Sequence, residues 1–92
     1  MNNIYVIIAR YENFESKYVG EDYNSGGYPY FSPYPYVFSK ESAKRFIKFW
    51  VTEANKICLR DVVILDLIEV NVKNVGITLI DTVRIKPFKE II

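Results

Sequence analysis

Hydrophobic residues recur at steps of three and four along residues 39–57. These steps place the side chains on one face of a helix with 3.6 residues per turn. Ser39 precedes the first turn, where its hydroxyl can accept a backbone N–H near Ser42, and Glu41 suits the positive end of the helix dipole. The pattern predicts a helix over residues 39–57 with this apolar face: Ala43, Phe46, Ile47, Trp50, Val51, Ala54 and Ile57.

The chain before this helix favours strands and turns. Residues 3–11 are apolar at both odd and even positions, which is typical of a strand inside a sheet. Residues 17–19 predict a short second strand, and the sequence DYNSGG at 22–27 predicts a flexible turn.

After the helix, residues 62–72 and 75–86 predict a long hairpin joined by a two-residue turn. With that turn, apolar residues lie opposite apolar residues along nearly the whole hairpin. A shift by one residue would set Ile64 against Arg84, which is a poorer match.

Together these elements predict a single α+β domain over residues 1–92, with one helix on one face of a mostly antiparallel sheet of three to four strands, in β-β-α-β-β order. Residues 62–72 are apolar on both faces, and one helix covers only part of one face. A second layer is therefore needed. Either the tyrosine-rich segment before the helix or a second copy of the chain supplies it, and a small protein usually solves this problem as a two-fold homodimer.

That tyrosine-rich segment, YPYFSPYPYVF at residues 28–38, is called the Tyr-Pro segment below. Its prolines at positions 29, 33 and 35 fix φ and remove N–H donors, so it is edge-like or polyproline-like and cannot be a central strand. An extended chain directs alternate residues to one side, so we expect the aromatic rings at even positions to point the same way: Tyr28, Tyr30, Tyr34, Tyr36 and Phe38. Those rings either cap a small core or form a recognition surface, because tyrosine combines a large contact area with a polar tip. In the second interpretation these residues bind a partner protein: Tyr28, Tyr30, Tyr34 and Tyr36.

The composition excludes several kinds of site. No histidine is present, which excludes Ser-His and Cys-His nucleophiles and Cys/His zinc sites within this chain. The single cysteine, Cys58, has no base to activate it and is expected to be a small buried apolar residue. We expect a non-enzymatic protein without cofactor or metal. No apolar run is long enough for a membrane span or has the flanks of a signal peptide, so we expect a cytoplasmic protein.

Positive charge is concentrated on the predicted helix. Residues 39–60 carry six basic and two acidic residues, although the net charge of the chain is only +1. Basic groups with an aromatic ring among them can bind phosphates and stack a base. This alternative, a nucleic-acid interface, would use Lys40, Lys44, Arg45, Lys48 and Phe49. The other interpretation is a solvated helix face whose Phe49 is covered by the Tyr-Pro segment.

In the expected hairpin register, Asp66 lies directly opposite Asp81. Two carboxylates about 5 Å apart would raise one apparent pKa and could serve acid–base catalysis or hold a divalent cation. A different register or an exposed sheet end would leave them without such a role.

The run NSGGYPYF at residues 24–31, followed by VFSKESAKRF at 37–46, resembles a pattern in small uncharacterised bacteriophage proteins. There a GGYP-aromatic segment precedes a phenylalanine, a short Ser/Lys/Glu cap and a helix. The resemblance implies an early phage gene product, a class that includes host-takeover factors and inhibitors of bacterial defence. Our leading hypothesis is a phage accessory or anti-defence factor that inhibits a host protein by direct contact. A nucleic-acid-binding protein is the alternative, and a carboxylate-pair enzyme or metal binder comes third.

Overall fold

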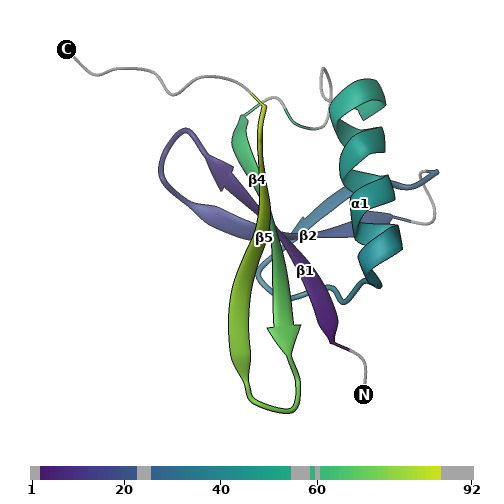
Figure 1. Ribbon diagram of the computed structural model, residues 1–92. Coiled ribbons are helices and arrows are strands. Elements are labelled where there is room, and N and C mark those ends of the chain that lie inside the picture. The colour runs from purple at the N-terminus through teal and green to yellow at the C-terminus, as the bar shows by residue number, and fades with distance from the viewer. Residues whose placement is uncertain (1–2, 23–25, 55–58, 60, 86–92) are drawn as a thin grey trace.

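The computed structural model describes residues 3–22, 26–54, 59 and 61–85 (Figure 1). Within these ranges five strands form one sheet: β1 (Ile4–Tyr11), β2 (Ser16–Asp22), β3 (Tyr28–Ser32), β4 (Val62–Asn71) and β5 (Gly76–Arg84). Between β3 and β4 lie the α-helix α1 (Lys40–Phe49) and the π-helical turn η2 (Trp50–Ala54). The predicted α+β fold with one helix on a mostly antiparallel sheet is confirmed. The sheet has one strand more than expected, because part of the Tyr-Pro segment joins it.

The strands are arranged in the order β3-β2-β1-β4-β5, and every neighbouring pair is antiparallel. β1 is the central strand, as predicted for a strand that is apolar on both faces. The short strand predicted at 17–19 belongs to β2, whose Val19 lies opposite Ile7 of β1. β3 is an edge strand, in agreement with its proline content. The sheet therefore ends in the Tyr-Pro segment on one side and in β5 on the other.

Helix α1 begins at the residue that the sequence predicts. The Ser39 hydroxyl accepts a hydrogen bond from the Ser42 N–H at 3.2 Å, which confirms Ser39 as the N-cap. The α-helix ends at Phe49 and widens into η2, where a uniform helix was expected. Thr52 in this turn donates its hydroxyl to the Lys48 carbonyl at 2.9 Å, a side-chain bond of the kind that competes with the helical ladder. Residues 55–57, at the expected helix end, lie outside the described residues.

The hydrophobic core lies between α1 and the face of the sheet that carries Ile7 and Leu67. Trp50 is fully buried at its centre, where its indole N–H donates to the Gly27 carbonyl at 2.8 Å. Of the predicted helix face, Ala43, Ile47 and Trp50 are buried, and Phe46 and Val51 pack against them; the side chains of Ala54 and Ile57 lie outside the described ones. The core cluster comprises Tyr5, Ile7, Ala9, Val19, Phe38, Ala43, Ile47, Trp50, Leu59, Val62, Leu65 and Leu67.

The β4–β5 hairpin keeps the predicted register only near its turn. There Ile68 lies opposite Leu79, as expected, but the register shifts by one residue between Leu67 and Ile68. Beyond that bulge Ile64 lies opposite Arg84, the pairing that seemed the poorer match. The prediction was wrong for this half because a bulge inserts one unpaired residue and no apolar pattern marks its position.

On the face of the sheet turned away from α1, called the far face below, residues of β1, β4 and β5 align in rows. Within each row the residues lie directly opposite one another in the β1–β4 and β4–β5 pairings. The two rows nearer the hairpin turn are entirely aliphatic, and the two at the other end carry charge. In order from the turn, the rows are Ile4, Val70 and Ile77; Val6, Ile68 and Leu79; Ile8, Asp66 and Thr82; and Arg10, Ile64 and Arg84.

Candidate functional site

The Tyr-Pro segment presents three of its four candidate tyrosines to solvent. Tyr28 and Tyr30 lie on β3 and are 40% and 57% exposed, and Tyr34 in the following bend is 75% exposed. Tyr36 differs, because it is half-buried and its ring centroid lies 4.8 Å from that of the buried Phe38. The expectation that all these rings point to one side is therefore wrong. The segment exposes rings at its beginning and contributes rings to the core at its end, so Tyr36 and Phe38 cap the core and recognition by the exposed rings stays a prediction.

The backbone of the Tyr-Pro segment explains why its first rings are exposed and its last rings point into the core. β3 ends at Ser32, so the alternation of an extended strand stops there. Six residues later, Phe38 pairs with Tyr5 at the start of β1, and the two residues exchange N–H···O bonds of 2.8 and 3.2 Å. This pairing holds the end of the segment against the core.

Tyr34 is held on a backbone that has little freedom. It lies between Pro33 and Pro35, which fix their own φ angles and restrict the residues before them. The Tyr34 N–H also donates to the Ser32 hydroxyl at 3.0 Å. A ring presented in this way loses little conformational entropy on binding.

Tyr28 is tied to the helix. Its ring stacks on Phe49 with a centroid separation of 6.1 Å and an interplanar angle of 18°. Phe49 is half-buried by this contact and packs against the core cluster. The aromatic member of the expected nucleic-acid interface is thus covered by the Tyr-Pro segment, as one of the two interpretations anticipated.

The basic residues of α1 are exposed along the helix. Lys40, Lys44, Arg45 and Lys48 are all exposed. Arg45 lies 5.5 Å above the Phe46 ring and donates to the Ser42 hydroxyl at 3.4 Å. The structure therefore places the four basic residues together on one helix but separates them from a freely accessible aromatic ring.

A groove of about 370 Å³ runs between α1 and the β4–β5 hairpin. Its floor is apolar, formed mainly by Ile47, Leu67 and Val83, and its rim carries Lys44, Lys48 and Asp81. The volume lies near the lower end of the range for small-ligand pockets.

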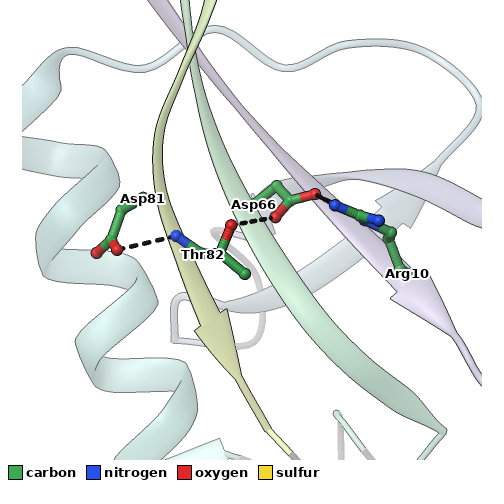
Figure 2. A network of polar contacts seen from close by, with 4 residues as sticks. All are labelled: Arg10, Asp66, Asp81 and Thr82. Atoms are coloured by element: carbon green, nitrogen blue, oxygen red, sulfur yellow. Dashed lines mark hydrogen bonds and ion pairs between the residues drawn. The ribbon is translucent and has the colours of Figure 1, made fainter. Parts of the chain in front are cut away.

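Asp66 is buried and paired, but its partner is not Asp81. The Arg10 guanidinium donates Nε–H and Nη2–H to one Asp66 oxygen at 2.7 and 2.6 Å, and the Thr82 hydroxyl donates to the other at 2.9 Å (Figure 2). Asp81 lies opposite Leu67 and points toward α1, so the two carboxylates are on opposite faces of the sheet. The expected Asp66/Asp81 opposition is wrong, because the bulge shifts β5 by one residue. Arg10 was missed in the sequence, although it is the one charged residue of an otherwise apolar central strand.

A second polar pair lies on the helix face of the sheet. The Tyr5 hydroxyl donates to the Glu69 carboxylate at 2.5 Å across the β1–β4 pairing. This hydrogen bond, with burial as a smaller cause, raises the pKa of Tyr5 above its ordinary value of 10.0. The same bond, assisted by Asn3 and Lys40, lowers the pKa of Glu69 below 4.5. The pair therefore favours an ionised Glu69 and a protonated Tyr5 at neutral pH.

Among the described residues, no three acidic or cysteine side chains gather in a group that could hold a metal ion. Cys58 lies outside the described residues. No helix in the described part of the chain is long and apolar enough to cross a membrane. Comparison of the chain with protein-family models, curated proteins and solved structures found no match.

Proposed function

We propose that this chain is a non-enzymatic binding protein that acts by direct contact with another protein, with Tyr30 and Tyr34 as its main anchors and Tyr28 beside them. The observation that carries the proposal is the presentation of these rings, 57% and 75% exposed for Tyr30 and Tyr34, on a proline-ordered backbone. Tyrosine is enriched among the residues that dominate binding energy. Tyr36 packs against the core and is left out of the anchor set.

β3 is an edge strand, but its proline favours recognition by side chains over strand addition. Pro29 is the second residue of β3 and lacks the N–H that an added strand would need. The resemblance to phage proteins directs the search to a bacterial host protein, whose inhibition by occupation of its surface is the proposed outcome.

The experiment compares three proteins in affinity capture from a bacterial lysate: the wild type, Tyr30→Ala/Tyr34→Ala, and the control Phe14→Ala. Phe14 is 81% exposed in the turn between β1 and β2, so the control removes an equally accessible ring elsewhere. Binding of the captured and purified protein is then measured by calorimetry. The double variant should lose roughly 30-fold or more in affinity, and Phe14→Ala should bind as the wild type does. Equal affinity of a folded double variant would contradict the proposal.

Nucleic-acid binding by α1 remains the second candidate, because four exposed basic side chains lie on one helix. The two candidate functions differ in how strongly binding depends on salt concentration. Affinity for mixed oligonucleotides would fall steeply with salt and in Lys44→Glu/Lys48→Glu, whereas a tyrosine-anchored protein contact would change little.

A further inference from the structure

Exposed aliphatic side chains gather at the turn end of the β4–β5 hairpin. Val72, Val75, Ile77 and Leu79 are 46%, 80%, 73% and 53% exposed. Ile77 and Leu79 belong to the two aliphatic rows of the far face, and Val72 and Val75 lie in the adjoining turn. In Figure 1 this end of the hairpin, at the bottom of the view, extends beyond α1. We call these four residues and the partly buried Ile4, Ile68 and Val70 the hairpin patch.

The backbone at Val75 indicates that this surface has a role beyond folding. Val75 has φ of 55°, a left-handed conformation that is costly for a β-branched residue and free for glycine. Hydrogen bonds stabilise the rest of the turn, because the Asn71 side-chain oxygen accepts from the backbone N–H groups of Lys73 and Asn74 at 3.0 and 3.1 Å. Glycine would suit this position better for folding alone, whereas valine adds an exposed side chain beside Ile77.

We propose that the hairpin patch is the interface of a two-fold homodimer, in which the same patch of a second copy packs face to face on it. The far-face charges of Arg10, Asp66 and Arg84 lie at the other end of the rows from the patch, and the charged residue of the turn itself is Lys73. A two-fold axis brings a surface onto itself, so like charges close to the axis would repel each other, and an uncharged patch avoids this repulsion. The second copy would also cover the part of β4 near the turn, where Ile68 and Val70 are only partly buried.

The area is sufficient for a weak dimer. The exposed fractions correspond to roughly 350 Å² of apolar surface per copy, taking about 100–130 Å² for a fully exposed valine, leucine or isoleucine side chain. Homodimer interfaces are about 65% apolar, so the pair would bury on the order of 1,000 Å² in total, the lower limit for a specific interface. Because an interface of this size is at the lower end of the range, we expect a weak, concentration-dependent dimer and take a micromolar dissociation constant as the working value. This inference is independent of the tyrosine anchors, which lie at the opposite edge of the sheet.

Sedimentation equilibrium from about 1 to about 200 µM, a range chosen to bracket a micromolar constant, tests the proposal with three variants. Ile77→Lys places a charge in the patch and should raise the dissociation constant about tenfold or more. Thr78→Lys, the matched control, adds the same charge on the same strand at an exposed position of the other face and should leave it unchanged. Val75→Gly should weaken the dimer without lowering the thermal stability of the monomer, which separates the interface from folding.

Three results would overturn the proposal. The wild type stays monomeric throughout this range, Ile77→Lys associates as well as the wild type, or Thr78→Lys weakens association as much as Ile77→Lys does. The variants are compared only as folded proteins, with the emission of the buried Trp50 as the criterion.

Discussion

The Tyr36 ring lies against Gly20 so closely that a β-carbon added to Gly20 would meet Tyr36 Cδ2 at 2.6 Å and Cγ at 2.9 Å. Gly20 is buried in β2, and the absent side chain is what allows the Tyr-Pro segment to pack there. This contact assigns Tyr36 to the fold, whereas Tyr30 and Tyr34 of the same segment remain accessible.

Gly20→Ala should therefore lower the free energy of unfolding by about 1–3 kcal/mol, because the ring must move out of a packed site. Urea unfolding followed by Trp50 fluorescence measures the loss. In the Tyr36→Ala background the same glycine substitution should cost clearly less, since the two nearest ring atoms are gone. An equal cost in both backgrounds would mean that the contact with Tyr36 does not limit the site.

Removal of Arg10 should leave the buried Asp66 carboxylate without its cation. We expect Arg10→Met to lower the free energy of unfolding by about 1–3 kcal/mol; breaking a fully buried pair costs more, but the Arg10 side chain is 49% exposed. A double-mutant cycle with Asp66→Asn, measured by urea unfolding, isolates the pair. The cost of Arg10→Met should shrink in the Asp66→Asn background, and strict additivity would argue against coupling.

Tyr5→Phe should change the pH dependence of stability. The folded pKa of Glu69 is below its ordinary 4.5 chiefly because of the Tyr5 hydrogen bond. That contribution is present above pH 4.5 and is lost as pH falls through the lower folded pKa. The folded pKa of Tyr5 is raised above 10.0, so its contribution is present below pH 10 and is lost as pH rises through the higher folded value. Thermal unfolding of both proteins across pH should show the variant less stable near neutrality, with a gap that narrows in acid and in strong alkali.

Val75→Gly should stabilise the isolated chain. Release of a left-handed valine gains about 1–2 kcal/mol, of which the greater freedom of an unfolded glycine offsets roughly 0.5–1 kcal/mol. We expect a net rise of about 0.5–1 kcal/mol in the free energy of unfolding, measured well below the dimer range. Val72→Gly is a suitable comparison, since Val72 is not at positive φ and should gain nothing.

The sequence by itself determined the elements whose signals are local. The apolar period and the Ser39 cap predict where α1 begins, the double-faced apolar pattern predicts a central β1, and the prolines predict an edge position for residues 28–32. Each of these follows from the chemistry of neighbouring residues, so no distant contact was needed.

Only the tertiary structure decided how the candidate site residues are used. The bulge in β5 moves Asp81 away from Asp66 and places Thr82 opposite it, and the β1–β4 pairing brings Arg10 to the same carboxylate. The Phe38–Tyr5 pairing turns Tyr36 inward, and the Tyr28 stack covers Phe49. These outcomes depend on contacts between residues far apart in the chain. The sequence pattern alone does not distinguish an apolar or aromatic side chain that the fold buries from one that it leaves exposed.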